Sequence, residues 1–303
     1  MSMTNDKRVK CESEFVPRKY WKYLAAFVVG MWVMFFIGLY ELPLFGEARL
    51  YFLDVGQGDA ILIRSPEGHN ILVDGGPKSV VMSELSEVLP FFGRDIDLMV
   101  LTHPHADHIE GLVEVLKRYE VGALLLTGIA YDNNYYEEFL KDVFELRDRG
   151  DLDVYIAESS VDFRVGSVYL DVLYPIESLA GRKIGNLNNS SIVMRVSLLG
   201  GGGFGASGWR SVLLSGDCEV ECEEEVLEAG FDIDADVMKA GHHGSKTAAS
   251  EEFVRAVSPE VVVIQCGVEN KFRHPHAETL RTFYRFGVRE VWRNDLDGRV
   301  EIL

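Results

Sequence analysis

Apolar residues follow two periods along the chain after residue 48. Short runs rich in Val, Ile and Leu between glycine-containing turns are typical of strands, whereas apolar residues three and four positions apart indicate helices. Ile109, Leu112, Val113 and Leu116 follow the helical spacing. The pattern predicts helices at 83–91, 109–119, 219–229, 250–257 and 277–286, and strands at 49–55, 60–65, 70–73, 96–102, 154–157, 168–174, 191–198, 211–215, 237–240 and 261–267, with a terminal strand pair at 290–293 and 298–303.

These elements form two similar halves in which strands and helices intermix. Each half supplies a mixed sheet and helices long enough to cover one outer face. We therefore predict an α/β fold of the αββα sandwich type, in one domain at 48–303. Gly200 to Gly203, with Gly205 and Gly208, lie between two predicted strands and lack the spacing of a phosphate-binding loop. They predict a flexible connection between those strands.

An uncharged apolar run precedes this domain. The eighteen residues from Tyr23 to Tyr40 contain no charge, which is close to the roughly 20 residues that cross a bilayer. Six basic residues precede the run, so the positive-inside rule predicts a cytoplasmic tail at 1–22, a transmembrane anchor at 23–45, and a domain outside the cytoplasmic membrane. A cleaved signal peptide is the alternative, although no good small-residue cleavage site follows.

The charge of the chain restricts its partners. The formal net charge is −18, and residues 1–40 contribute +3, which leaves −21 on the remainder. Such an acidic surface repels a polyanion at long range, so a nucleic-acid role requires a local basic patch. The segment from Arg255 to Arg293 has the opposite sign, with seven Lys or Arg against four acidic residues. This segment either binds a phosphate-bearing substrate or is a solvated helix face.

The cysteines predict no metal site. Cys11 lies in the predicted tail, which leaves an odd number in the domain, namely Cys218, Cys222 and Cys266. Cys218 and Cys222 are four residues apart on a predicted helix, where a disulfide would be strained. We therefore predict free, buried thiols. The sequence contains no CxxC zinc pattern.

The segment THPHADH, Thr102 to His108, carries the strongest chemical signal. It places four side chains of metal-binding type within six residues, directly after an apolar strand. His103 and His105 point to one side, because side chains of extended backbone alternate with period two. Asp107 and His108 enter the next helix and can face a second ion. Neutral imidazoles and a hard carboxylate predict two adjacent divalent metal ions.

Further polar residues follow other predicted strands. Asp217 ends an apolar strand, where a single carboxylate could bridge two ions. Asp74 is better placed to orient a ligand histidine than to bind metal itself. His242 and His243 follow the strand at 237–240. One of the two could reach a metal while the other packs or forms a hydrogen bond.

Together, the motifs resemble those of the metallo-β-lactamase-fold domain at the C-terminus of the competence protein ComEC, over about residues 48–303. The HxHxDH element belongs to the whole superfamily, whereas DVGQGDA at 54–60 and GHHGS at 241–245 are far narrower. The remaining elements of the resemblance are VDGG at 73–76, NNSS at 188–191, LSGD at 214–217 and HPH at 274–276.

The resemblance implies the αββα fold and a dinuclear metal site. Asn188 and Asn189 stand where many superfamily members place another histidine ligand. The first ion would then take an amide oxygen or extra water, which leaves zinc and manganese as alternatives, because an oxygen-rich set favours the harder ion. The matching ligand positions are His103, His105, Asp107, His108, Asp217 and His242, with Asp74 and His243 supporting them.

A dinuclear site of this kind predicts a hydrolase. Two bridged divalent ions activate water for attack on phosphorus and neutralise the phosphate. The leading hypothesis is a phosphodiesterase that acts on DNA, single-stranded above all, and that is linked to DNA uptake. The candidate catalytic residues are Asp107, Asp217 and His276, and the candidate substrate-binding residues are Asn189, Lys246, Arg273 and His274.

Two alternative functions stay open at this point. One is hydrolysis of a small ester, lactone, amide or phosphodiester, because this fold does not determine the substrate. The other is a tethered binding or assembly module whose metals only brace the fold. ComEC proteins also carry a multi-helix DNA channel, which one predicted span cannot form. A separate channel protein is therefore a candidate partner, and the oligomeric state is not predicted.

Overall fold

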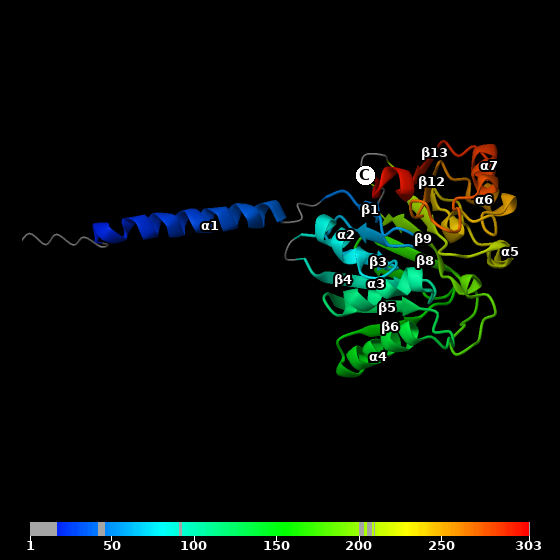
Figure 1. The fold of residues 1–303 in the computed structure, drawn as a ribbon, viewed down its shortest axis with the longest axis horizontal. Coiled ribbons are helices and arrows are strands. Elements are labelled where there is room, and N and C mark those ends of the chain that lie inside the picture. The colour runs from blue at the N-terminus through cyan, green and yellow to red at the C-terminus, as the bar shows by residue number, and fades with distance from the viewer. Residues whose placement is uncertain are drawn as a thin grey trace, which may run out of the picture. The chain divides into compact units, whose positions relative to one another are not determined.

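The structure, a computed structural model, describes residues 17–41, 46–90, 93–199, 203–204, 208 and 210–302. The chain divides into two units, Met1–Leu42 and Pro43–Leu303. The first unit contains a 3-10 turn, Arg18–Tyr20, followed by helix α1, Trp21–Glu41 (Figure 1). Most of the predicted cytoplasmic tail, and positions 42–45 of the predicted anchor, lie outside the described residues.

The predicted membrane anchor at 23–45 is corrected by the structure. Within the described part of the chain, no helix combines the length and the apolar character that crossing a bilayer requires. The predicted single-pass placement in the cytoplasmic membrane is therefore wrong.

Two seven-stranded sheets form the centre of the second unit. The first sheet has the order β14-β1-β2-β3-β4-β5-β6, and the second has the order β13-β12-β11-β10-β9-β8-β7. The strands of the first sheet are β1 (Arg49–Phe52), β2 (Ile61–Arg64), β3 (Asn70–Val73), β4 (Asp95–Leu101), β5 (Glu120–Leu126), β6 (Asp153–Ile156) and β14 (Val300–Ile302). Those of the second are β7 (Phe163–Val165), β8 (Val168–Tyr174), β9 (Val193–Leu198), β10 (Ser211–Leu214), β11 (Val237–Lys239), β12 (Val261–Ile264) and β13 (Glu290–Arg293).

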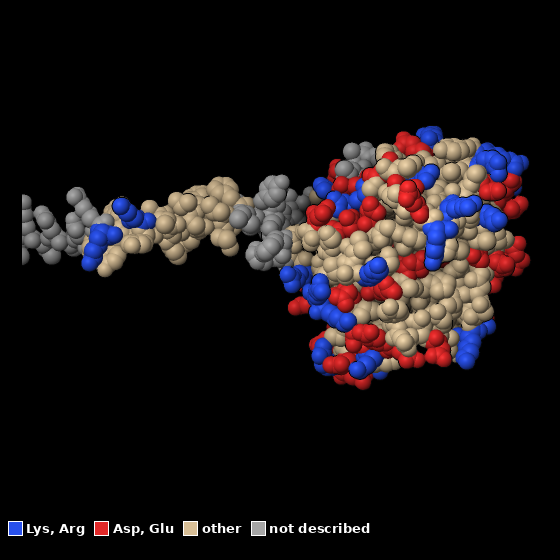
Figure 2. All heavy atoms as spheres, viewed as in Figure 1, with Lys and Arg blue, Asp and Glu red and all other residues tan. Residues whose placement is uncertain are grey.

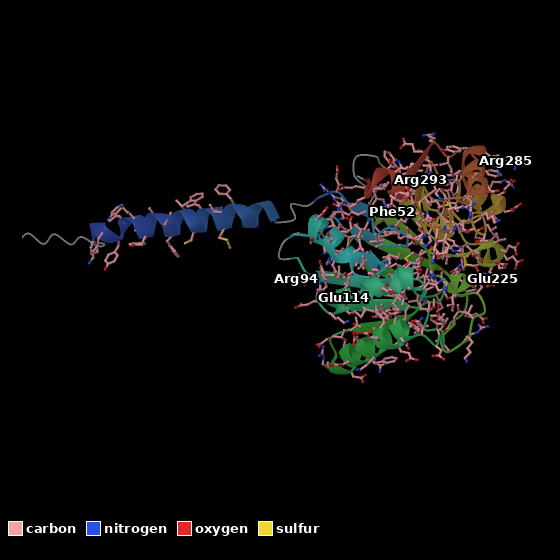
Figure 3. All side chains as sticks on the ribbon, viewed as in Figure 1. Phe52, Arg94, Glu114, Glu225, Arg285 and Arg293 are labelled. Carbon is pink, nitrogen blue, oxygen red and sulfur yellow. A yellow bond between two sulfur atoms is a disulfide. The ribbon has the colours of Figure 1, made fainter. Side chains whose placement is uncertain are left out.

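Buried side chains make up three apolar layers. Phe52 and Ile63 of the first sheet meet Met194 and Val263 of the second in the central layer, and Figure 3 shows Phe52 inside this body. Separate outer layers join each sheet to its own helices, which confirms the αββα sandwich (Figure 1). The helices are α2 (Val80–Val88), α3 (Ala106–Leu116) and α4 (Asn134–Arg149) on the first sheet, and α5 (Val220–Ala229), α6 (Glu251–Val257) and α7 (Ala277–Arg285) on the second.

Several elements differ from the prediction, and the short strand β7 and helix α8 (Asn294–Asp297) are among those not predicted. Strand β5 and helix α4 were not predicted, because their apolar residues are interrupted by Gly122 and by the many charged residues of α4. The predicted terminal pair does not form, since β13 pairs with β12 and β14 pairs with β1 of the other sheet. Helix α8 makes the crossing, and Asn294 Nδ2 donates to the carbonyl oxygen of Phe52 at 3.1 Å.

The cysteines also differ from the prediction. Cys218 and Cys222 form a disulfide with their Cα atoms 5.5 Å apart. Helix α5 begins only at Val220, so Cys218 lies in the preceding turn and the pair does not have the helical geometry that would strain a bridge. Cys266 is free and buried, as predicted.

The topology gathers polar loops at one edge of each sheet. Strands β3, β4, β5 and β6 are parallel, as are β10, β11, β12 and β13. Their carboxyl ends therefore face the same way, as at the ligand-binding edge of other α/β sheets. Asp74 follows β3, the THPHADH segment follows β4, Asp217 follows β10, and the histidine pair follows β11.

Candidate metal centre

Side chains from these loops converge on one buried centre. Asp217 lies at its middle, where its Oδ2 atom is 3.4 Å from Nε2 of His108 and 3.4 Å from Nε2 of His243. Four overlapping sets of three side chains bring their ligand atoms within 4.8 Å of one another. The sets are His103, His108 and Asp217; Asp107, His108 and His243; Asp59, Asp74 and His108; and Asp59, Asp217 and His243.

The two histidines before α3 lie side by side, as their spacing predicts. Nε2 of His103 is 2.9 Å from Nδ1 of His105 and 3.9 Å from Oδ2 of Asp217. Ser191 links this part of the centre, because its hydroxyl accepts from the backbone N–H of Asp217 and lies 3.3 Å from Nδ1 of His103. Burial, together with neighbouring His108, lowers the pKa of His103 well below its usual value. A neutral imidazole is the form that binds metal.

Asp74 holds His108 from behind. Its Oδ2 atom lies 2.8 Å from Nδ1 of His108 and accepts the Thr102 hydroxyl at 2.6 Å, while Oδ1 accepts the Thr102 backbone N–H at 2.8 Å. Nε2 of His108 therefore faces Asp217. Burial disfavours a charged ring here, yet the carboxylates of Asp217 and Asp74 raise the pKa of His108 well above its usual value. The centre thus stabilises positive charge at this point.

The GHHGS turn places its two histidines differently in the centre. His242 and His243 have φ angles of 45° and 55°, and this left-handed turn points their rings in different directions. His243 is buried, with Nε2 3.5 Å from Oδ2 of Asp107 and Nδ1 2.9 Å from the carbonyl oxygen of Gln265. His242 turns to Glu219, 2.8 Å from Nδ1. His243 therefore lies beside both Asp107 and Asp217, whereas His242 approaches Asp217 at 3.9 Å from Nε2 to Oδ2, and its assignment as a metal ligand stays a prediction.

Two residues of the centre were missed in the sequence. Lys239 is fully buried at the end of β11, where it pairs with Asp59 and donates to the carbonyl oxygen of Gly216 at 2.7 Å. Asp59, from the DVGQGDA segment, also lies 3.2 Å from Nδ1 of His243. A lysine inside the apolar strand Val-Met-Lys-Ala was the available signal, because an unpaired ammonium is rarely buried.

Glu219 is a third missed residue, and it orients Asn188 next to the centre. Its Oε1 atom accepts from Nδ2 of Asn188 at 3.1 Å and from the Thr247 hydroxyl at 2.8 Å. Since Nδ2 of Asn188 donates to Glu219, Oδ1 of Asn188 remains available to bind a metal ion in the centre. Burial and neighbouring His108 lower the pKa of His105, and a side-chain hydrogen bond with Asn188 opposes this shift. Asn188 therefore lies where the missing histidine ligand was expected.

The predicted substrate-binding residues fall into two groups. Asn189 anchors the start of α5, because its Oδ1 accepts the backbone N–H of Glu219 and its Nδ2 donates to Glu221, and its role in substrate binding stays a prediction. The others lie around the histidine pair. His274 has its ring centroid 5.4 Å from that of His242 and 4.9 Å from that of His276. Lys246 and Arg273 are exposed.

His276 also lies at the exposed border of the centre, called the rim here, beside Lys246, Arg273 and His274. Its Nδ1 accepts the backbone N–H of Lys246 at 3.0 Å, and its own N–H donates to Gly244. It belongs to none of the four buried sets. Burial and the neighbouring imidazoles lower the pKa of His274 to about 4, which leaves that ring neutral at physiological pH. Neither ring is part of the central cluster, and both border it.

The donor set fits divalent metal ions. Five polar side-chain atoms are buried here and have no hydrogen-bond partner among the described residues, which is costly unless something else satisfies them. Two of them approach Asp217 closely without the alignment of a hydrogen bond. Carboxylate, imidazole and amide oxygen are all ligands of zinc and manganese. The atoms are Asp59 Oδ1, His108 Nε2, Asn188 Oδ1, Asp217 Oδ1 and His243 Nε2.

Comparison with known proteins agrees with this geometry. Residues 53–268 match the family model described as the Metallo-beta-lactamase superfamily. The chain belongs to this superfamily. It is thus a metallo-β-lactamase superfamily hydrolase, and the divalent metal binding that the fold implies is consistent with the His and Asp sets of the structure.

Curated relatives narrow the resemblance. The chain is 29% identical to ComE operon protein 3 of Bacillus subtilis over 286 residues, covering 89% of this chain and 34% of that protein. It is 29% identical to competence protein ComA of Neisseria gonorrhoeae over 257 residues, covering 84% and 32%. These names confirm a ComEC-like metallo-β-lactamase-fold protein. The chain spans about a third of the length of these relatives.

Solved structures show the same fold. The metallo-beta-lactamase fold protein YhfI from Bacillus subtilis gives a TM-score of 0.51 at 14% identity, covering 84% of this chain and 100% of that one. A metallo hydrolase from Ignicoccus hospitalis gives 0.52 at 15% identity, covering 84% and 99%. At such identities the likeness shows the fold alone.

Asp74→Asn is expected to lower metal affinity ten- to a hundredfold, the usual effect of losing a partner that orients a ligand histidine. The amide nitrogen would face Nδ1 of His108 and could not accept its proton. Titration with Mn²⁺ by calorimetry measures the effect. Asp97→Asn is the matched control, because Asp97 holds His69 in the same way, at 2.7 Å from Nδ1, outside the centre. Equal affinities in both variants would contradict the role of Asp74.

Proposed function

We propose that this protein is a metal-dependent phosphodiesterase that cleaves DNA, single-stranded DNA above all. The buried centre around Asp217 carries the proposal, because four overlapping sets of metal-binding side chains meet there and two of them contain Asp217. Two divalent ions bound there supply a water of lowered pKa and compensate the charge of a phosphate. The relatives named for competence, and a third relative named Recombination protein 2 from Haemophilus influenzae, support DNA as the substrate.

The residues of the chain divide the work of holding the ions. His103 and His105, with the amide oxygen of Asn188, would hold one. Asp107, His108 and His243 would hold the other, and Asp217 lies between the two sets. The oxygen from Asn188 leaves manganese and zinc as candidates.

Residues behind the ligands keep them oriented. Asp74 holds the ring of His108, and the Gln265 carbonyl and Asp59 hold that of His243. Lys239 compensates the charge of Asp59. The rim residues Lys246 and Arg273 are the candidate phosphate contacts, and His276 is the candidate proton donor to the leaving oxygen. In this proposal, residues 48–303 form the catalytic domain. The protein takes part in DNA uptake, and a separate channel protein is its partner.

Cleavage of labelled oligonucleotides tests the proposal directly. The purified protein is incubated with single-stranded and double-stranded DNA in the presence of Mn²⁺ or Zn²⁺, and bound metal is measured by elemental analysis. We expect cleavage of single-stranded DNA with at least one of these ions. Absence of cleavage in a sample shown to contain bound metal would refute it.

Salt dependence separates this function from hydrolysis of a small ester or phosphodiester, which the domain charge of −21 favours. Two or three phosphate contacts predict that oligonucleotide cleavage falls on the order of tenfold between 50 and 200 mM salt. Turnover of bis(p-nitrophenyl) phosphate should change far less. If both substrates responded equally to salt, the small-substrate function would be the better one.

A further inference from the structure

An exposed aromatic ring lies at the outer end of a row of rings that begins in the metal centre. The ring of His243 stacks on that of His274, with centroids 6.2 Å apart and planes at 30°. His274 in turn stacks on Phe272, at 5.6 Å and 22°. Phe272 is 48% exposed. The exposed ring of Phe272 therefore ends a stack of rings that starts at His243, a candidate metal ligand.

The loop that presents Phe272 is held in place. Asn270 braces it, since its Nδ2 donates to the carbonyl oxygens of Gly267 and His274 and its Oδ1 accepts the His274 backbone N–H. Gln57 accepts the backbone N–H of Gly267, which ties the loop to the DVGQGDA segment. Arg273 has a φ of 62°, a conformation that only a well-determined loop maintains. The ring of Phe272 is thus presented by an ordered loop and not by a free segment.

Positive charge that is not committed to ion pairs lies on the same rim. Lys246, Lys271 and Arg273 form no ion pair with any residue that the structure describes, and Nζ of Lys271 lies 4.8 Å from the Phe272 ring centroid. Among the other cations of the basic segment, Arg255 lies over the ring of Phe286 and the remaining four arginines form ion pairs. Figure 2 shows acidic and basic side chains mixed over the face that includes α7, with Arg285 and Arg293 marked in Figure 3. The pairs are Arg281 with Glu278, Arg285 with Glu251, Arg289 with Glu260, and Arg293 with Asp295.

We propose that Phe272 is a base-stacking subsite for an unpaired nucleotide next to the phosphate that is cut. This rests on the proposed function and specifies its substrate as a strand with unstacked bases. Aromatic rings bind bases through their flat faces and tolerate any sequence, and nearby cations bind the phosphates. Lys271, whose ammonium now lies over the ring, would move aside when a base stacks and could then bind the phosphate of that nucleotide. Bases inside a duplex are not available for such stacking, so the subsite selects single strands.

Phe272→Ala tests the subsite, with Tyr284→Ala as the matched control. Tyr284 is 64% exposed on α7 and has no ring contact among the described residues. We expect Phe272→Ala to lower kcat/KM for a single-stranded oligonucleotide about tenfold to a hundredfold, since a base stack contributes that much. Phe272→Trp should keep the activity, and Tyr284→Ala should not alter it. Metal content is measured in all three variants to show that the centre is intact.

A substrate series with one abasic position identifies the stacked base. With the wild type, an abasic site at one position next to the cut should reduce cleavage. The reduction should equal the factor that Phe272→Ala causes with the intact oligonucleotide. In Phe272→Ala the same abasic site should have no further effect. Full additivity of the two losses would overturn the inference.

A binding measurement tests base stacking on Phe272 independently of DNA cleavage. Fluorescence anisotropy with the metal-loaded protein and a labelled phosphorothioate oligonucleotide, which resists cleavage, measures binding alone. If the wild type binds metal but cuts no DNA, the proposed function fails, yet weaker binding by Phe272→Ala would still support the subsite. Equal binding by the wild type and Phe272→Ala would overturn the subsite whether or not the protein is a nuclease.

Discussion

Asp217→Ala is expected to abolish hydrolysis and to release at least one metal ion while the domain stays folded. Asp217 is the carboxylate within 3.4 Å of both His108 and His243, so its loss removes an atom from both ligand sets. Metal ions contribute several kcal/mol to the stabilisation of the transition state, which corresponds to a rate loss of about a thousandfold or more. Elemental analysis, kinetics and thermal unfolding of the same preparation measure the three effects.

Asp132→Ala is the control for Asp217→Ala, because Asp132 is an exposed aspartate remote in sequence from every motif of the centre. It should keep full metal content and activity. Hydrolysis that persists in Asp217→Ala would remove this residue from the site. Unfolding of Asp217→Ala in the presence of excess Mn²⁺ would contradict the expectation that the domain remains folded without this carboxylate.

His243→Ala and His242→Ala have unequal effects. His243 lies between Asp107 and Asp217, whereas His242 makes its shortest contact with Glu219. We expect His243→Ala to lose one ion and to lower the rate about a thousandfold, again because a metal contributes several kcal/mol. His242→Ala should keep both ions and lose at most about a hundredfold, the range for a residue outside the ligand set.

The two variants control for each other. Both residues have positive φ angles, 45° for His242 and 55° for His243, so replacement by Ala meets similar backbone strain at each position. Metal content by elemental analysis and kcat with an oligonucleotide are compared in parallel. Loss of an ion from His242→Ala but not from His243→Ala would restore the ligand assignment that the sequence motif suggested.

Much of the architecture was predictable from local pattern. Alternating and helical periods are short-range properties of the chain, and they located most of the strands and helices and the αββα class. The THPHADH segment was also readable, because strand alternation and one helix start decide where four neighbouring side chains point. Asp74 and Asp217 were recognised as the polar residues that end apolar strands. In each case the physical determinant lies within a few residues of the position concerned.

Partners that meet through the sheet order required the tertiary structure. Asp59 and Lys239 come from different sheets, and no local period relates them. The left-handed GHHGS turn, which decides that His243 faces the centre, depends on long-range contacts such as the one with Gln265. The pairing of β14 with β1 and the contact of Asn189 with Glu219 also join distant segments. Local sequence restricts where a side chain can point, while the residue that meets it is selected only when distant segments pack together.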